Sequence, residues 1–103
     1  MVYRVLVTQH AKEDLLNNLI YLAYEKKNPQ AVVSVEKDFY DTLDKLSYAA
    51  GTFRLIGGQF NKFGSRKILF VNMHNYYLIY HIVNNQVIVD RMYHVLQNPK
   101  NIK

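Results

Sequence analysis

Apolar residues recur three or four positions apart between residues 11 and 27, which is the pattern of a helix that buries one face. Leu15, Leu19 and Leu22 form this apolar stripe. Thr8 precedes it and is a residue type that caps helix N-termini. The pattern therefore predicts a first helix that ends at about Lys26 or Lys27.

A second helical pattern begins at Asn28-Pro29, because asparagine suits an N-cap and proline is tolerated at the first helical position. Val35 and Phe39 continue the spacing, and Gly51 is expected to end the helix. Because the connection between the two helices is so short, they are expected to pair antiparallel as a hairpin.

Four further segments are rich in Val, Ile, Phe or Tyr, which predicts strands. They are Tyr3–Thr8, Arg66–Val71, Tyr76–Val83 and Gln86–His94. Asn84-Asn85 suits a two-residue hairpin turn, because asparagine tolerates positive φ. The stretch Gly51–Gly64 predicts an irregular loop with apolar anchors, among them Phe60.

The order strand, helix, helix and three strands predicts an α+β fold, in which an antiparallel helix hairpin packs on a small antiparallel sheet. One domain, residues 1–103, is expected from the length. The chain has no cysteine, which excludes disulfides, thiol nucleophiles and Cys-based zinc sites. Neither a targeting pattern nor an apolar run of ~20 residues is present, so a cytoplasmic protein without membrane contact is expected.

The chain is basic, with 13 Lys and Arg against 8 Asp and Glu and a formal charge of +5. Such a charge attracts an acidic partner, which could be nucleic acid, a ribosomal surface or an acidic protein. A charge of this size also serves plain solubility, so both interpretations stay open.

Strand pairing around the asparagine turn predicts which side chains share a face of the sheet. Counting outward from the turn gives the pairs Tyr80–Val89, Leu78–Arg91 and Tyr76–Tyr93. One face is then expected to carry Lys67, Tyr76, Tyr80, Arg91 and Tyr93. The other is expected to carry Arg66, His81, Asp90 and His94. Because side chains alternate along a strand, Arg91 and His94 lie on opposite faces unless the strand ends or bulges between them.

Each candidate site residue has a functional and a structural interpretation. The imidazole of His94 could act as a general acid or base, or it could bond the backbone at a strand end. Arg91 in an apolar strand needs a partner, either a helix carboxylate or a phosphate. Arg66 and Lys67 could be solvated edge charges or ligand contacts, and Tyr80 could stack on a base or pack in the core. The remaining histidines show no metal-ligand spacing, so neither a metal nor a cofactor is expected.

Several short motifs follow one another along nearly the whole chain. They are Tyr3–Thr8 with Ala11 and Glu13–Leu15, then Phe53–Leu55, Arg66-Lys67, Asn75–Tyr80, and Val87–His94 followed by Asn98. In order and spacing they resemble the RelE/ParE superfamily of small bacterial toxins, and Arg91 and His94 match the Arg-x-x-His of ParE-like members. The resemblance implies two N-terminal helices on a small antiparallel sheet. It also implies the growth-arresting toxin of a type II toxin–antitoxin system, with a cognate antitoxin as partner.

The resemblance leaves two mechanisms open. A ParE-like toxin binds DNA gyrase and needs no chemistry of its own, and the gapless Arg-x-x-His match favours this mechanism. A RelE-like toxin is a metal-independent endoribonuclease that acts on ribosome-bound mRNA, and its catalytic residues here would be His94, Arg91, Tyr93 and Lys67. Under either mechanism, the expected binding residues are Arg66, Lys67, Tyr80, Arg91 and His94.

Two departures from the ribonuclease pattern weaken the second mechanism. Tyr77 stands where RelE-like members often carry arginine, and no Arg or Lys lies between His94 and Lys100.

Overall fold

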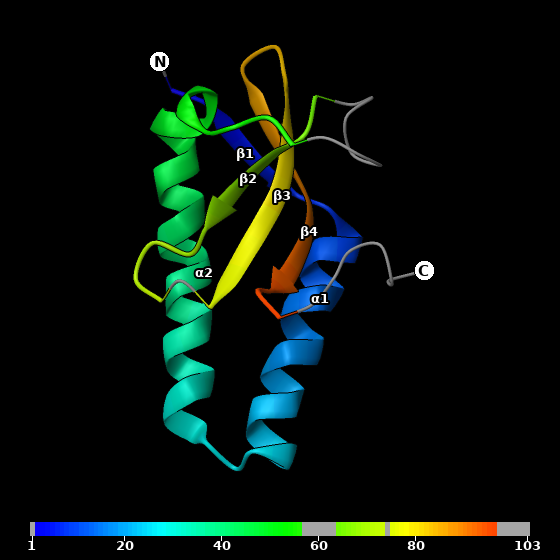
Figure 1. Cartoon of the computed structure of the whole chain (residues 1–103), viewed down its shortest axis with the longest axis vertical. Coiled ribbons are helices and arrows are strands. Elements are labelled where there is room, and N and C mark those ends of the chain that lie inside the picture. The colour runs from blue at the N-terminus through cyan, green and yellow to red at the C-terminus, as the bar shows by residue number, and fades with distance from the viewer. Residues whose placement is uncertain (1, 57–63, 74, 97–103) are drawn as a thin grey trace.

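The computed structural model describes residues 2–56, 64–73 and 75–96. One strand, two helices and three strands follow one another in the predicted order (Figure 1). The α+β fold and the helix hairpin are confirmed. The expected anchor Phe60, the motif residue Asn98 and His74 lie outside the described residues.

Helix α1 (Gln9–Ile20) begins where the sequence predicts, because Thr8 Oγ1 accepts a hydrogen bond from the Ala11 amide at 3.2 Å. A π-helical turn, η1 (Tyr21–Glu25), extends the helix. Lys27 then adopts a φ of 49°, a left-handed conformation that takes the chain out of the helix. The predicted end of this first helical segment is therefore confirmed.

Helix α2 (Pro29–Ala49) starts at the predicted cap, where Asn28 Oδ1 accepts a hydrogen bond from the Ala31 amide at 3.1 Å. A short 3-10 turn, η2 (Ala50–Thr52), follows it. Helices α1 and α2 run antiparallel beside each other (Figure 1).

The strands β1 (Arg4–Val7), β2 (Arg66–Leu69), β3 (Tyr76–Val83) and β4 (Gln86–His94) form one sheet with the order β1-β4-β3-β2. The last three strands form the predicted antiparallel meander, and Asn84 in the hairpin turn has a φ of 57°. β1 is instead parallel to β4, so the sheet is mixed rather than purely antiparallel. The alternation of residues within β1 predicts a strand but not the neighbour or direction it takes.

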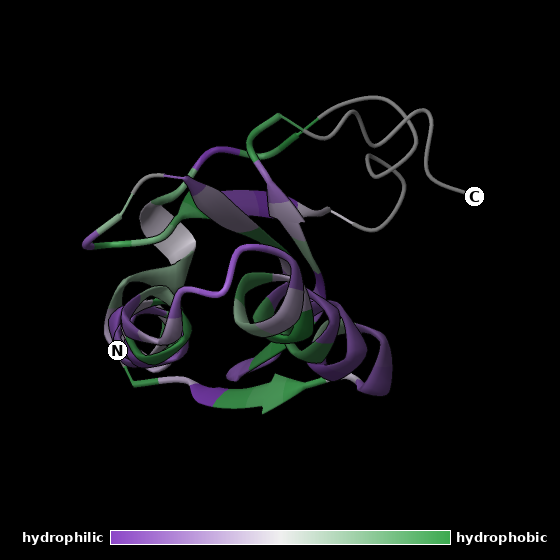
Figure 2. Cartoon of the chain, turned by 90° about the horizontal axis from the view of Figure 1, so that it is seen from below, coloured by the Kyte–Doolittle hydropathy of each residue, from purple (hydrophilic) through white to green (hydrophobic). Residues whose placement is uncertain are grey.

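Both helices lie on one side of the sheet (Figure 2). Their apolar stripes form one core with the inward side chains of the strands, as predicted: Leu15, Val35 and Phe39 are buried, and Leu19, Leu22 and Leu43 pack against them. The sheet contributes Ile68, Tyr76, Leu78, Tyr80, Val87, Val89 and Met92, and Phe70, directly after β2, joins them.

Asp38 of α2 fixes the connection between β2 and β3. Its side chain is buried, with the residue only 1% exposed. One carboxylate oxygen accepts a hydrogen bond from the Asn72 amide at 2.9 Å, and the other accepts from the Met73 amide at 2.6 Å. Thr42, one turn further along α2, accepts from the Val71 amide at 3.2 Å. The turn that follows β2 is therefore tied to the helix.

Candidate functional site

A β-bulge in β4 decides which side chains share a face of the sheet. The predicted pairing is confirmed from the turn as far as Tyr80 and Val89, but the next pair is Ile79 with Arg91, which leaves Asp90 as an extra residue. Beyond the bulge the predicted register is wrong by one residue, and the pairs are Leu78–Met92, Tyr77–Tyr93 and Tyr76–His94. The bulge allows Val89 and Met92, three positions apart, both to reach the core.

Strand β2 does not place Lys67 on the face of Tyr80, as the sequence predicted, because Lys67 lies opposite Ile79 and Arg66 lies opposite Tyr80. The expected single face is therefore divided between the two sides of the sheet. The outer face, away from the helices, carries Lys67, Tyr77, Ile79, Arg91 and Tyr93. The helix side carries Arg66, Tyr76, Tyr80 and His94.

The outer face holds two neighbouring contacts between a cation and an aromatic ring. Lys67 Nζ lies 4.4 Å from the centre of the Tyr77 ring, and the Arg91 guanidinium lies 5.2 Å from the centre of the Tyr93 ring. The two ring centres are 5.6 Å apart. Both tyrosines are buried, and this burial raises the pKa of each phenol. These tyrosines pack the face and support the cations.

Arg91 is held by a carboxylate of the first helix. Its Nε and Nη2 donate to the two oxygens of Asp14 at 2.7 and 3.0 Å, and Asp14 also accepts from the Met92 amide at 3.0 Å. The hydrogen bonds to Asp14 raise the pKa of the guanidinium. Of the two partners that the sequence left open, a helix carboxylate or a phosphate, the fold supplies the carboxylate.

His94 stands at the end of β4 on the helix side. Its ring packs edge-on against Tyr76, with centres 5.0 Å apart, and its Nδ1 accepts a hydrogen bond from the Leu96 amide at 3.1 Å. It lines a hollow between the sheet and the helix hairpin, together with Tyr21 and Met73. The bulge lies before Arg91, so alternation persists beyond it. His94 and Arg91 therefore occupy opposite faces, and the sheet does not bring them together.

Arg66 and Tyr80 both support the segment that follows α2. Arg66 Nη1 donates to the Phe53 carbonyl at 2.6 Å, and the fully buried Tyr80 hydroxyl donates to the Ala50 carbonyl at 2.6 Å. Burial raises the pKa of Tyr80 well above its usual value. Tyr80, expected to be a binding residue, is thus a core residue of this fold.

Sequence reasoning missed the pairing of His81 with Asp90. His81 follows the inward-pointing Tyr80 and faces outward, and its Nδ1 lies 2.7 Å from Asp90 Oδ2 across the bulge. The two residues were expected on one face, but their contact depends on the extra residue in β4. The only sequence signal for this pairing was that His81 and Asp90 are each polar residues within an apolar strand.

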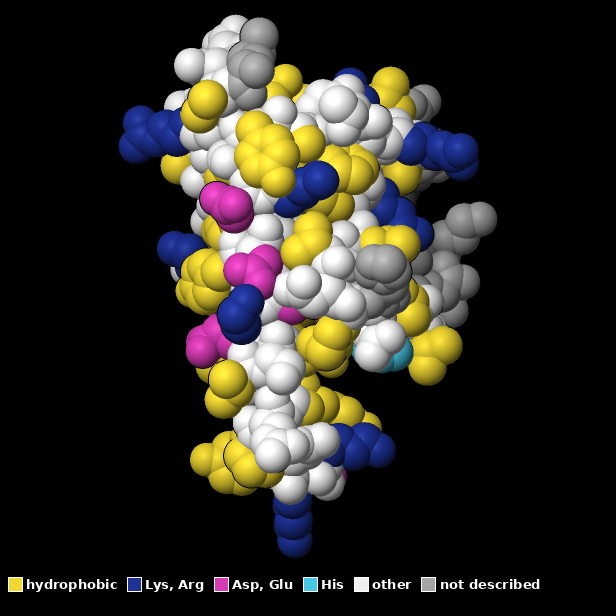
Figure 3. Space-filling view, turned by 90° about the vertical axis from the view of Figure 1, so that its left-hand side faces the viewer, with side chains coloured by type: hydrophobic (Ala, Val, Ile, Leu, Met, Phe, Trp, Pro, Cys, Tyr) yellow, Lys and Arg dark blue, Asp and Glu magenta, His cyan; other side chains and the backbone are white. Residues whose placement is uncertain are grey.

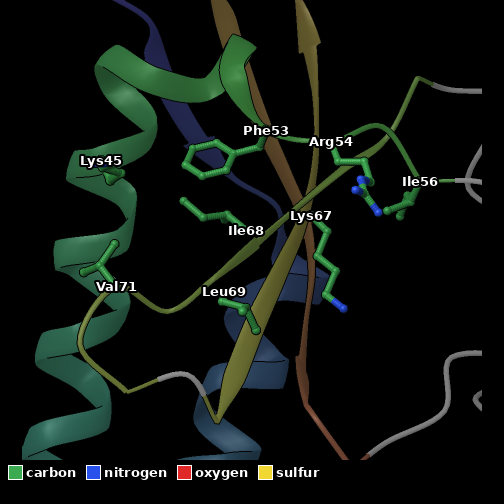
Figure 4. Close-up of a pocket in the computed structure, with 8 residues that line it drawn as sticks. All are labelled: Lys45, Phe53, Arg54, Ile56, Lys67, Ile68, Leu69 and Val71. Atoms are coloured by element: carbon green, nitrogen blue, oxygen red, sulfur yellow. The ribbon is translucent and has the colours of Figure 1, made fainter.

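The exposed margin of β2 borders a groove of ≈ 510 Å³ that sequence reasoning also missed (Figure 4). Its lining combines apolar and basic side chains: Phe53, Ile56, Ile68, Leu69 and Val71, with Lys45, Arg54 and Lys67. Of these, only Lys67 was a candidate from the sequence. Because the lining residues come from α2, the following loop and β2, their proximity depends on the tertiary fold.

Within residues 2–56, 64–73 and 75–96, no group of three or more acidic or histidine side chains is arranged to hold a metal ion. No helix in the same ranges is long and apolar enough to cross a membrane.

The fold is similar to a solved chain described as "Chromosomal ParDE TA system from P. aeruginosa", where TA denotes toxin–antitoxin. The superposition has a TM-score of 0.71 and covers 91% of this chain and 97% of that chain, at 14% sequence identity. At this identity the likeness establishes the fold alone. No protein-family model and no curated protein matches the sequence.

Proposed function

We propose that this chain is the toxin of a type II toxin–antitoxin system, a RelE/ParE-like domain over residues 1–103 that arrests growth in the bacterial cytoplasm. The observation that carries the proposal is the likeness in fold, over 91% of the chain, to a chain from a ParDE TA system. The order of motifs from Tyr3–Thr8 to Val87–His94 supports the same superfamily from the sequence. A cognate antitoxin is the partner, and no cofactor is involved.

The favoured mechanism is binding of a protein target, DNA gyrase, without chemistry by the toxin. Metal-independent RNA cleavage needs a proton acceptor, a proton donor and cations around one phosphate. His94 lies on the helix side, whereas Lys67, Arg91 and Tyr93 lie on the outer face. In addition, Asp14 balances the charge of Arg91. Both observations favour binding over cleavage.

A RelE-like ribosome-dependent endoribonuclease is the alternative, supported by the shared outer face of Lys67, Arg91 and Tyr93. In that case an imidazole of the outer face would have to replace His94 as acid or base. His81, oriented by Asp90, is the candidate. Loss of mRNA cleavage in His81→Ala but not in His94→Ala would support this alternative.

Induction in a bacterial host without the antitoxin tests the toxin proposal. Growth should stop, and co-expression of the antitoxin from a neighbouring gene should restore it. Normal growth in the presence of folded, soluble protein would contradict the proposal.

Arg91→Ala and Asp14→Asn provide a matched pair of variants, because both break the same ion pair. If Arg91 also contacts the target, Arg91→Ala restores growth while Asp14→Asn stays toxic. Circular dichroism of both purified variants verifies that they fold. Equal toxicity of both folded variants would exclude Arg91 from the target contact.

A further inference from the structure

The margin of β2 has an incomplete set of hydrogen bonds. The Phe70 amide donates to Tyr76 in β3, so the even-numbered residues of β2 face β3 and the odd-numbered residues face outward. Two outward groups are occupied: the Lys67 amide donates to the Arg54 carbonyl at 3.4 Å, and the Ser65 carbonyl accepts from Ile56 at 2.8 Å.

Leu69 is the next outward residue along β2. The segment that pairs with the start of this strand leaves it at Phe53, where the chain turns back into η2. Among the described residues, the outward amide and carbonyl of Leu69 have no backbone partner. Side chains nearby are accessible, since Leu69 is 41% and Val71 36% exposed. Within the described part of the chain, no segment pairs with Leu69, so one more short strand can add there.

The groove beside this margin has two chemically different sides. Phe53, Ile68 and Val71 lie toward α2, which itself carries Lys45, whereas Arg54 and Lys67 extend on the other side of the strand (Figure 4). Side chains of an added strand would alternate between these sides. Apolar residues would therefore meet the α2 side, and acidic residues would meet the two cations.

The charges around the groove are available to a partner. Among the described residues, no carboxylate forms an ion pair with Lys45, Arg54 or Lys67. Asp41, whose partner Asn72 follows the lining residue Val71, is already bonded to Lys37 and Asn72. Hydrophobic and basic side chains intermingle beside the upper part of α2, while acidic side chains lie along the helix itself (Figure 3).

We propose that this groove binds an extended segment of a protein partner, with alternating apolar and acidic residues, which adds a strand beside Leu69. The inference rests on the proposed function in one respect: it takes the antitoxin as the protein that carries this segment. Main-chain bonds to Leu69 provide affinity, and the alternation of side chains provides specificity.

Other occupants fit the groove less well. A second copy of this chain would bring a net charge of +5 against the same basic groove. A single-stranded nucleic acid would find cations, but the floor is largely aliphatic and offers few stacking surfaces or donors for bases. An acidic, apolar peptide matches both the floor and the rim.

Fluorescence anisotropy with a labelled peptide of alternating glutamate and valine tests the groove directly. We expect it to bind the wild-type protein, whereas a peptide of the same composition in two blocks should not. Arg54→Glu/Lys67→Glu should weaken binding by roughly tenfold or more, because two attractive contacts become repulsive. Leu69→Pro should also weaken binding, because proline removes the outward amide. The matched control Lys12→Glu/Lys27→Glu changes the net charge equally and should bind like the wild type.

Three results would overturn the inference. The first is unchanged binding of the alternating peptide to both groove variants, and the second is equal binding of the block peptide to the wild type. The third is that the wild type binds an oligouridine probe but not the peptide, and that the groove variants lose this binding of oligouridine.

A cellular experiment separates this inference from the proposed function. Leu69→Pro with Arg54→Glu should still arrest growth but should no longer be relieved by the antitoxin. Full relief by the antitoxin would overturn the inference and leave the toxin proposal intact. If the wild type does not arrest growth, the toxin proposal fails, while the peptide result still decides whether the groove binds this type of segment.

Discussion

The part of β4 that extends beyond β1 and the outer edge of β2 are two margins of the sheet, and they are completed in opposite ways. Beyond the end of β1, Asp14 reaches from α1 to the margin of β4 and accepts hydrogen bonds from Arg91 and the Met92 amide. Thr8 adds a bond to the Val89 carbonyl at 2.9 Å. At the margin of β2, no side chain of the described residues reaches Leu69 in this way.

This difference shows how basic residues in one small sheet can have different roles. The charge of Arg91 is balanced by Asp14 within the fold, whereas Arg54 and Lys67 form no ion pair among the described residues. A basic residue in a strand is therefore a better candidate for contacting a partner where the neighbouring helix offers no carboxylate. Among the described residues, the margin of β2 combines an outward amide and carbonyl of Leu69 that have no backbone partner with two cations that form no ion pair.

The strongest effect on stability is expected at Asp38, which ties the turn after β2 to α2. Asp38→Ala leaves two backbone amides without acceptors and should lower the free energy of unfolding by about 3 kcal/mol. Asp38→Asn keeps one acceptor oxygen and should lower the free energy of unfolding by less. Urea denaturation of both variants measures this order, and equal stability of wild type and Asp38→Ala would show that the turn does not depend on the helix.

A smaller loss is expected when the closed margin is opened. Asp14→Ala should cost about 2 kcal/mol, because it removes the acceptor of both Arg91 and the Met92 amide. The pair is partly exposed, with side chains 26% and 16% accessible, so the value lies below that of a fully buried pair. A double-mutant cycle with Arg91→Ala should give a coupling of about 1 kcal/mol. Additive losses would mean that the two side chains do not interact in solution.

Alkaline pH should weaken both faces of the sheet through their buried tyrosines. Burial raises the pKa of Tyr76, Tyr77, Tyr80 and Tyr93 above the usual value of 10.0. A pKa that is higher in the folded state gives stability that is complete below pH 10.0 and is lost as the pH rises through the folded values. Melting temperatures should therefore fall above that pH, over the same pH range in which the absorbance of tyrosinate appears. A flat profile up to strongly alkaline pH would contradict the burial of these hydroxyl groups.

The smallest effect on stability is expected at the open margin. Leu69→Pro removes an amide that has no partner among the described residues, and proline is tolerated on edge strands, so the loss should be about 1 kcal/mol or less. Urea denaturation of this variant measures the loss of stability. A loss as large as that of Asp14→Ala would show that this margin is closed in solution, and the contrast between the two margins would not hold.

The helices and the hairpin turn could be predicted because their signals are local. Thr8 and Asn28 are caps whose hydrogen bonds reach only three residues along the chain, and both are confirmed. The spacing of Leu15, Val35 and Phe39 likewise predicts the buried helix faces, because helical geometry alone fixes that periodicity.

The sheet was harder to predict, because its details depend on distant residues. A bulge at Asp90 is not visible in the alternation of β4, yet it moves every later side chain to a new partner. The contact between Asp14 and Arg91 joins residues 77 positions apart. The sequence left a helix carboxylate and a phosphate open as partners of Arg91, and only the three-dimensional structure could decide between them.

The most direct test of the central claim is a DNA supercoiling assay with purified gyrase and the purified, folded wild-type chain. If the protein is a ParE-like toxin, supercoiling should be inhibited as the toxin reaches the gyrase concentration, and addition of the antitoxin should restore it. Full gyrase activity at a large molar excess of the folded protein would contradict the proposed target.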